Sequence, residues 1–177
     1  NHRNTIEIAC LAQHFYAGTD AGKPDLPVRK GQIPPYLIDY GVLEYMTRRI
    51  VRHAGIHPND LIAVITANNE SQDAMRRRLE PACQNERLHF EWYRSGNKRV
   101  PDFSREGIVL LNIQSVKGLE FDSVIIADLH RHYVGRHSEA HKMKLYVATS
   151  RARDRLYLFY NRAIDCPLLK FMPGEDI

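Results

Sequence analysis

The stretch that decides the fold is Gly107–Leu129, with the sequence GIVLLNIQSVKGLEFDSVIIADL. It contains two apolar runs of about six residues, rich in Val and Ile and bounded by polar residues. Runs of this kind are typical of parallel strands that are covered on both faces. Between them, the sequence Lys117–Gly118–Leu119–Glu120 places a cation, a glycine and a carboxylate in a short loop. Because loops on rigid strands often carry function, this loop is a candidate site.

Strand and helix signals alternate on both sides of this stretch, which predicts an α/β fold with a mostly parallel sheet. We expect helices within residues 1–17, capped by Asn4 or Thr5, over 42–53, from 69 or 71 to 79, and over 138–150. We expect further strands near Val28, over 61–66 and over 156–160. The aromatic segment 89–104 fits either an edge strand or a loop, and its aromatic residues among cations also suit stacking on nucleobases.

The bulk composition describes an ordinary globular protein, since 44% of its 177 residues are hydrophobic and 26% are charged. We expect one domain over residues 1–165 and a tail or linker over 166–177. The net charge of +4 permits a polyanionic partner without requiring one. The three widely spaced cysteines indicate a reducing, cytoplasmic environment. No apolar run approaches the roughly 18 residues of a membrane helix, so we expect no membrane partner.

Three basic residues recur at the expected ends of strands and helices, namely Arg3, Lys117 and Arg151. Arginine is always charged and presents a planar fork that matches phosphate oxygens. Arginines that converge from several element ends are therefore suited to a nucleotide phosphate or to its transition state. A competing interpretation of Arg151 is a structural contact with a helix C-terminus, where cations are favoured.

Three segments resemble motifs of superfamily 1 helicases of the UvrD/Rep kind. NHRNTIEI resembles motif IV, QSVKGLEFDSVII resembles motif V, and LYVATSRARDRLYL resembles motif VI. The three occur in the family's order and extend from residue 1 to about residue 160. The resemblance implies the second, C-terminal RecA-like domain of such a helicase, a P-loop NTPase-type fold without the P-loop itself.

The resemblance also implies half of an ATP site. ATP with Mg²⁺ would lie in a cleft against an N-terminal RecA-like domain of the same protein, which supplies the P-loop and the Mg²⁺ ligands. By position in the motifs, Arg3 and Arg151 would reach the γ-phosphate, and His2 would stack on adenine. Glu120 would bind the ribose hydroxyls beside Gly118, which suits a tight turn. A structural alternative for Glu120 is a helix cap.

The same resemblance implies contacts to single-stranded DNA from Asn112, Gln114, Ser115 and Lys117. Asn112 stands where the family has threonine, and Gln114 stands where it has histidine. Both replacements can still form hydrogen bonds with a phosphate or a base. Roughly 110 residues separate the first two motifs, which one compact domain absorbs, so we expect no UvrD-like accessory domain in that interval.

Other charged groups have simpler interpretations. Arg48, Arg49 and Arg52, like the run Arg76–Arg78, are expected to form solvated helix faces. The histidines of DLHRHYVGRHSEAHK lack the H-E-x-x-H order of a zinc helix, so we expect no metal site.

The motifs predict a DNA helicase or translocase that hydrolyses ATP, with this chain alone inactive. Two alternatives stay open at this point. One is a helicase-derived module that ATP switches without unwinding, and the other is an RNA translocase, because backbone contacts to single strands carry little information about the sugar.

Overall fold

The structure, a computed structural model, describes residues 4–18, 22–96, 101–133 and 138–172. These residues form a six-stranded sheet in which all neighbouring strands are parallel. Its strands are β1 (Tyr36–Asp39), β2 (Leu61–Thr66), β3 (Phe90–Tyr93), β4 (Gly107–Asn112), β5 (Phe121–Ile126) and β6 (Ala152–Tyr160). The α-helices are α1 (Ile6–Gln13), α2 (Leu43–Ile56), α3 (Asn69–Asn85) and α4 (Ser138–Thr149), and 3₁₀ helices cover Ile113–Ser115, Leu129–His132 and Pro167–Phe171.

The strand order across the sheet is β1-β6-β5-β2-β4-β3. The two strands of the deciding stretch, β4 and β5, are therefore consecutive in the chain but separated in the sheet by β2. Because all three strands are parallel, the connection 113–120 begins at the carboxyl edge of the sheet and ends at the amino edge. We call this connection the crossing segment.

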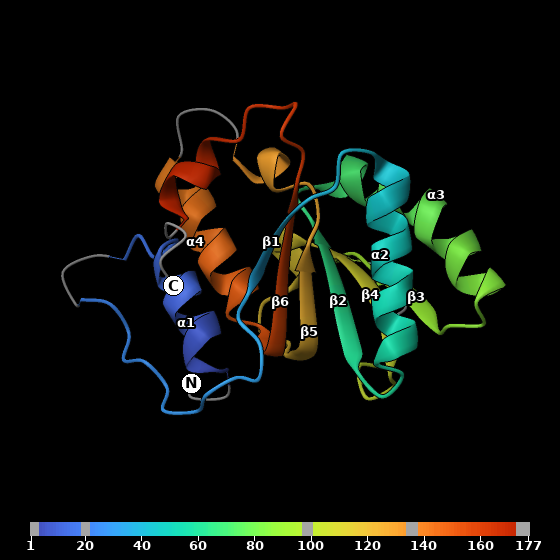
Figure 1. Cartoon of the computed structure of the whole chain (residues 1–177), viewed down its shortest axis with the longest axis horizontal. Helices are drawn as coiled ribbons and strands as arrows, with labels where there is room; N and C mark the ends of the chain where they lie inside the picture. The colour runs from blue at the N-terminus through green and yellow to red at the C-terminus, as the bar shows by residue number, and fades with distance from the viewer. Residues whose placement is uncertain (1–3, 19–21, 97–100, 134–137, 173–177) are drawn as a thin grey trace.

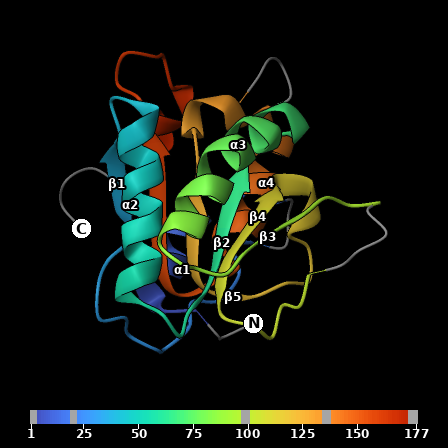
Figure 2. The same cartoon turned by 90° about the vertical axis from the view of Figure 1, so that its right-hand side faces the viewer.

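Helices cover both faces of the sheet. Figure 1 shows α1 and α4 on one side and α2 and α3 on the other, and Figure 2 shows α2 and α3 from their own side. Side chains of β4 alternate between the two faces, as the strand period requires. Val109 and Leu111 are buried in the core beneath α1 and α4, whereas Ile108 and Leu110 are buried beneath α2 and α3. The predicted α/β architecture is confirmed.

Local signals explain where two helices begin. The predicted cap Thr5 accepts a hydrogen bond from the Ile8 amide and starts α1. The cap of α3 is not the expected Asn69 or Ser71 but Asn68, whose side chain accepts a hydrogen bond from the Ser71 amide at 2.9 Å. Both side chains satisfy an amide that has no partner within the helix.

Two helices extend beyond their predicted ends. Helix α3 continues through Pro81 to Asn85, because Leu79 and Cys83 on either side of the proline are fully buried. Their burial outweighs the one hydrogen bond that the proline lacks. Helix α2 likewise passes Gly55 and ends at Ile56.

The strand predicted near Val28 is wrong. Val28 is 95% exposed and lies outside any strand, in a segment that carries Pro24 and Pro27. The strand of this region is instead β1, which pairs in parallel with β6 at the edge of the sheet. The aromatic segment that fitted two interpretations contains the edge strand β3, which pairs with β4.

Part of the segment expected to be a tail packs on the domain. Cys166 and Leu168 are buried in the core beneath α1 and α4, and Pro167–Phe171 forms a 3₁₀ helix. The core therefore extends past residue 165, to at least Leu168.

The first prediction tests this extension of the core. Replacing the fully buried Leu168 with Ala leaves a cavity, so the free energy of unfolding should fall by about 2–5 kcal/mol in urea denaturation. Leu37→Ala, at a side chain that is 42% exposed, is the matched control and should cost clearly less. Equal effects of the two substitutions would place Leu168 outside the cooperative core.

Candidate functional site

The predicted phosphate contact Arg151 lies at the amino edge of the sheet, where α4 ends and β6 begins. Its side chain is half-buried, and its Nε donates a hydrogen bond to the Val147 carbonyl at 3.2 Å. This is the contact with a helix C-terminus that competed with the phosphate interpretation. This contact uses only the Nε of Arg151. No described residue forms a hydrogen bond or ion pair with Nη1 or Nη2 of the Arg151 guanidinium.

The segment that resembles motif IV meets the same junction. The Asn4 amide nitrogen Nδ2 donates a hydrogen bond to the Ser150 carbonyl at 3.0 Å, although 146 residues separate the two. Asn4 is buried, with 8% of its surface exposed, so this contact is held within the fold. His2 and Arg3 lie outside the described residues.

The predicted ribose contact Glu120 also lies at the amino edge, directly before β5. The amide of the next residue, Phe121, donates a hydrogen bond to the Arg151 carbonyl at 3.0 Å. Glu120 is half-buried and lines a cavity of about 370 Å³ together with Arg153. Gly118 has a φ of +82°, a conformation that favours glycine, so its expected role in a tight turn is confirmed.

The predicted DNA contacts begin at the opposite, carboxyl edge of the sheet. The Asn112 side-chain oxygen accepts hydrogen bonds from the amides of Gln114 and Ser115, both at 3.1 Å, and from the Ser115 hydroxyl at 2.9 Å. Its Nδ2 donates to Asn69 Oδ1 at 2.6 Å. Asn112 and Ser115 are buried, whereas Gln114 and Lys117 are exposed.

The structure thus divides the predicted site residues into two groups. Glu120 and Arg151 lie together at the amino edge, and Asn112, Gln114 and Ser115 lie at the carboxyl edge. The crossing segment joins the two groups through Lys117 and Gly118. Their ligands stay predictions, but the separation is a direct consequence of the parallel strand order.

Trp92 on β3 has cationic neighbours within the protein. The guanidinium carbon of Arg76 lies 4.4 Å from the centre of the indole, and that of Arg94 lies 5.9 Å from it. Arg94 also donates hydrogen bonds to Gln72 and Asp73 on α3. The aromatic residue among cations is therefore packed as part of the fold, and Arg76 is more than a solvated charge.

Sequence reasoning missed a second set of groups, on the face of α2. Arg49 and Arg52 are exposed as expected, but with His53 and His57 they line a cavity against β1 and β6. The signal was present in the spacing, because residues 49, 52, 53, 56 and 57 share one face of a helix. It could not be used without knowing which strands lie beneath that face.

Sequence reasoning also missed a polar network that ends at His53, one of the residues that line this cavity. Asp60 Oδ2 accepts hydrogen bonds from Arg155 at 2.9 Å and from the Ser123 hydroxyl at 3.0 Å. The Ser123 oxygen lies 3.0 Å from His53 Nε2. Burial, together with the positive charges of His57, Arg155 and Arg49, lowers the pKa of His53 to about 4.

No group of three or more His, Cys, Asp or Glu residues that could hold a metal ion occurs among the described residues. His137 lies outside them. No described helix has the length and apolar character needed to cross a membrane.

The parallel sheet with helices on both faces is a RecA-like α/β fold, and comparison with known proteins agrees. Residues 107–159 match the family model of the UvrD-like helicase C-terminal domain. This range contains both the segment that resembles motif V and the one that resembles motif VI. The resemblance to UvrD-like helicases is therefore confirmed over this part of the chain.

One solved structure supports the fold over nearly the whole chain. The C-terminal domain of a "possible DNA helicase" from Lactobacillus plantarum WCFS1 matches with a TM-score of 0.69 at 20% identity, over 98% of this chain and 95% of that one. This similarity confirms the RecA-like fold.

Larger helicases match less closely. Arterivirus nonstructural protein 10, a helicase in complex with DNA, has a TM-score of 0.48 at 12% identity, over 78% of this chain and 34% of that one. The helicase domain of Hef from Pyrococcus furiosus has a TM-score of 0.47 at 13% identity, over 71% of this chain and 27% of that one. A search of the curated proteins found no match.

The second prediction concerns His53 and His132, two histidines whose pKa values are lowered by burial. The pKa of His53 is lowered on folding from 6.5 to about 4, so the unfolded chain binds its proton more readily. The stability that the neutral ring contributes is present above pH 6.5 and is lost as the pH falls toward 4. The free energy of unfolding, measured in urea across this range, should therefore fall less steeply for His53→Gln than for the unsubstituted chain.

His132→Gln provides a matched second variant, because burial also lowers the pKa of His132 to about 4. His132 is buried, and its Nε2 lies 3.0 Å from the Ala127 carbonyl oxygen. A pKa lowered from 6.5 to about 4 corresponds to about 3 kcal/mol of stability that is lost as this ring becomes protonated. If the free energy of unfolding depends on pH in both variants as it does in the unsubstituted chain, the claim that folding lowers the pKa of these two rings is contradicted.

Proposed function

We propose that this chain is the C-terminal RecA-like motor domain of an ATP-dependent superfamily 1 DNA helicase or translocase. The observation that carries the proposal is the meeting of three motif-like segments at the amino edge of the sheet. Asn4 is bonded to the Ser150 carbonyl, and the Arg151 carbonyl accepts from Phe121. Segments from the beginning, middle and end of the chain are thus held at one place, as a composite nucleotide site requires.

In this proposal, ATP with Mg²⁺ binds between this edge and an N-terminal RecA-like domain of the same protein. That domain holds the P-loop and the Mg²⁺ ligands. Arg151 contributes its two terminal nitrogens, while Nε remains on the Val147 carbonyl. This anchor restricts the side-chain rotamers, so less conformational entropy is lost when the guanidinium contacts the γ-phosphate.

Two further contacts complete the nucleotide half-site in this proposal. The carboxylate of Glu120 accepts hydrogen bonds from the ribose hydroxyls, and the turn at Gly118 positions the backbone next to it. Arg3 supplies a second guanidinium and His2 an aromatic ring for adenine. The hydrogen bond from Asn4 to the Ser150 carbonyl supports this assignment. It holds Asn4, the residue that follows Arg3, next to the residue that precedes Arg151.

Single-stranded DNA would bind at the carboxyl edge and along the crossing segment. Asn112 and Ser115 shape the turn with their internal hydrogen bonds, and the exposed Gln114 and Lys117 contact the strand. A lysine neutralises a backbone phosphate, and an amide can form a hydrogen bond with a phosphate or a base. Closure of the cleft on ATP and its opening after hydrolysis would then move the strand in steps.

The third prediction tests the role of Arg151. In the full-length protein, Arg151→Ala should lower the ATP turnover rate by about 10³–10⁵-fold, the range observed for arginine fingers, because charge on the leaving phosphate loses its partner. Single-stranded DNA affinity should change little.

Arg78→Ala is the control, since it removes an arginine on α3 whose ion pair is with Glu44, away from the amino edge. Turnover should stay close to that of the unsubstituted protein in this control. The finger assignment is wrong if Arg151→Ala hydrolyses ATP at the normal rate, or if this chain alone hydrolyses ATP.

The fourth prediction tests the strand contact. In the full-length protein, Lys117→Ala should weaken binding to single-stranded DNA and reduce the slope of log affinity against log salt by about 0.7, the value for one phosphate contact on a single strand. Gln114→Ala should weaken binding without changing this slope, because it removes no charge. Fluorescence anisotropy with a labelled oligonucleotide over a salt series measures both.

Lys144→Ala, at an exposed position on α4, is the matched control for loss of one positive charge. If it lowers the salt slope as much as Lys117→Ala, the effect reflects net charge and contradicts a specific contact.

A second candidate function is an ATP-switched module that does not unwind DNA. The hydrogen bonds that the Asn112 and Ser115 side chains form within the protein favour this second function. They leave fewer polar groups at the carboxyl edge for hydrogen bonds with a nucleic acid strand. A strand-displacement assay on the full-length protein separates the two functions. ATP hydrolysis that DNA stimulates without strand displacement would support the switch, and parallel assays with RNA strands would identify an RNA translocase.

A further inference from the structure

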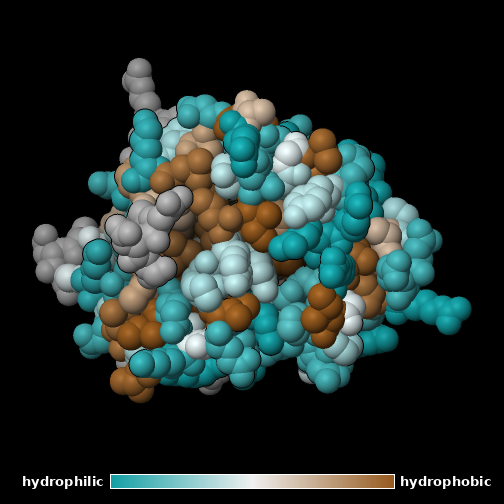
Figure 3. All heavy atoms as spheres, viewed as in Figure 1, coloured by the Kyte–Doolittle hydropathy of each residue, from teal (hydrophilic) through white to brown (hydrophobic). Residues whose placement is uncertain are grey.

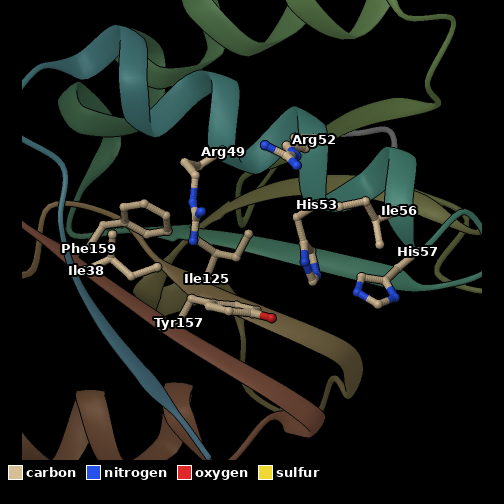
Figure 4. A pocket seen from close by; sticks show the side chains of 9 residues that line it. All are labelled: Ile38, Arg49, Arg52, His53, Ile56, His57, Ile125, Tyr157 and Phe159. Atoms are coloured by element: carbon tan, nitrogen blue, oxygen red, sulfur yellow. The ribbon is translucent and has the colours of Figure 1, made fainter. Parts of the chain in front are cut away.

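The cavity on the α2 face of the sheet has no role in the proposed motor function. It lies between α2 and the strands β1, β5 and β6, opens to solvent, and has a volume of about 270 Å³. Figure 4 shows the side chains of Arg49 and His53 directed from α2 toward Tyr157 on β6, with His57, just after the end of α2, beside them. Arg151 lies instead between the end of α4 and the start of β6, and α4 covers the opposite face of the sheet (Figure 1).

Positive charge gathers at the mouth of this cavity. Arg49 and Arg52 line it and are exposed, and neither forms an ion pair with any described residue. No carboxylate is among the residues that line the cavity. By contrast, Arg78 on the neighbouring helix α3 is paired with Glu44 at 2.8 Å. Two arginines beside a cavity without a compensating carboxylate form a site for an anion.

The floor of the cavity is aromatic and apolar. Tyr157 meets the edge of the His53 ring, with centroids 5.0 Å apart, and stacks on Tyr36 at 5.8 Å with an angle of 9° between the planes. Phe159 and Ile125 are buried beneath the same space. Figure 3 shows hydrophobic atoms in the middle of the face that carries β1, with hydrophilic atoms around them. The surface therefore offers a flat apolar wall directly below the arginines.

These features together select the ligand. We propose that the cavity binds a nucleoside monophosphate group, with the planar base against Tyr157 and the phosphate at Arg49 and Arg52. The volume lies just below the range of about 300–1,000 Å³ for pockets that hold drug-sized ligands, which suits a ligand as small as one nucleotide. The group can come from a free mononucleotide or from the phosphorylated end of a nucleic acid strand.

The hydrogen bonds under the cavity keep the wall in place. The Ser123 hydroxyl links the His53 ring to Asp60, and Arg155 holds the same Asp60 oxygen. His53 is thus fixed beside Tyr157 before any ligand arrives, which reduces the entropy lost on binding.

The fifth prediction tests the site by calorimetric titration of the 177-residue chain with AMP, adenosine and inorganic phosphate. AMP should bind, and adenosine and phosphate alone should each bind about tenfold or more weakly, because each makes only half of the contacts. Arg49→Gln and Arg52→Gln should each weaken AMP binding about tenfold, and Tyr157→Leu should weaken it as well. Equal affinity for AMP and phosphate would overturn the base contact, and the absence of AMP binding would overturn the site.

Arg48→Gln is the matched control, because Arg48 is exposed on the same helix but does not line this cavity. It should leave AMP affinity unchanged, and an effect equal to that of Arg49→Gln would overturn the proposal. Glu120→Ala distinguishes this site from the proposed ATP half-site, because AMP has the ribose that Glu120 is proposed to bind but lacks the γ-phosphate. If that substitution alone abolishes AMP binding, the ligand lies at the amino edge and the inference is wrong.

A second titration identifies the source of the group. Short single-stranded oligonucleotides with a 5′-phosphate or a 5′-hydroxyl are added to the chain and competed with AMP. Binding of the phosphorylated strand that AMP displaces and that Arg52→Gln weakens supports a strand end as the ligand. If AMP displaces neither strand, the result supports a free mononucleotide.

Discussion

The order of the parallel strands is the constraint on which the candidate sites depend. Because β2 lies between β4 and β5, the chain between these strands must cross from one edge of the sheet to the other. Parallel strands require such a crossover, which is usually an α-helix. Here the connection is a short 3₁₀ helix and a glycine turn, so the polar residues within it are distributed over both edges.

Each end of the crossing segment is fixed by hydrogen bonds of a different kind. At the carboxyl edge, one buried carboxamide, that of Asn112, closes the turn and joins it to Asn69 at the start of α3. At the amino edge, backbone and side-chain contacts tie Phe121 and Asn4 to the junction of α4 and β6. Residues 112–117 at the carboxyl edge and residues 118–121 at the amino edge are neighbours in the sequence. A ligand at either edge would therefore contact residues within a few positions of the other set. In the proposed function, this proximity along the chain would couple the nucleotide state to the strand contact.

The buried strands could be predicted from the sequence because their signal is local. The apolar runs of β2, β4 and β5 are continuous, as strands covered on both faces must be. Strand β1 was missed because its four residues, Tyr36–Asp39, are partly exposed and give no such run. The length of α3 was missed because the burial of Leu79 and Cys83, which carries the helix past Pro81, depends on tertiary packing.

The candidate sites divide in the same way. Motif-like segments identified Glu120 and Arg151 from the sequence, and the fold brings these two to one edge. The cavity beside Arg49 and Arg52 could not be found from the helix alone, since its floor comes from β6, about 100 residues further along the chain. Charges on a helix face indicate a site only when the surface that they face is known.

The central claim is that one short segment presents two separate ligand surfaces at opposite edges of the sheet. Hydrogen–deuterium exchange on the full-length protein tests it most directly, with single-stranded DNA and a non-hydrolysable ATP analogue added separately. The account predicts that DNA slows exchange at residues 113–117, and that the ATP analogue slows it at 118–121 and 150–152. Protection of the same residues by both ligands, or of neither range by either ligand, would contradict it.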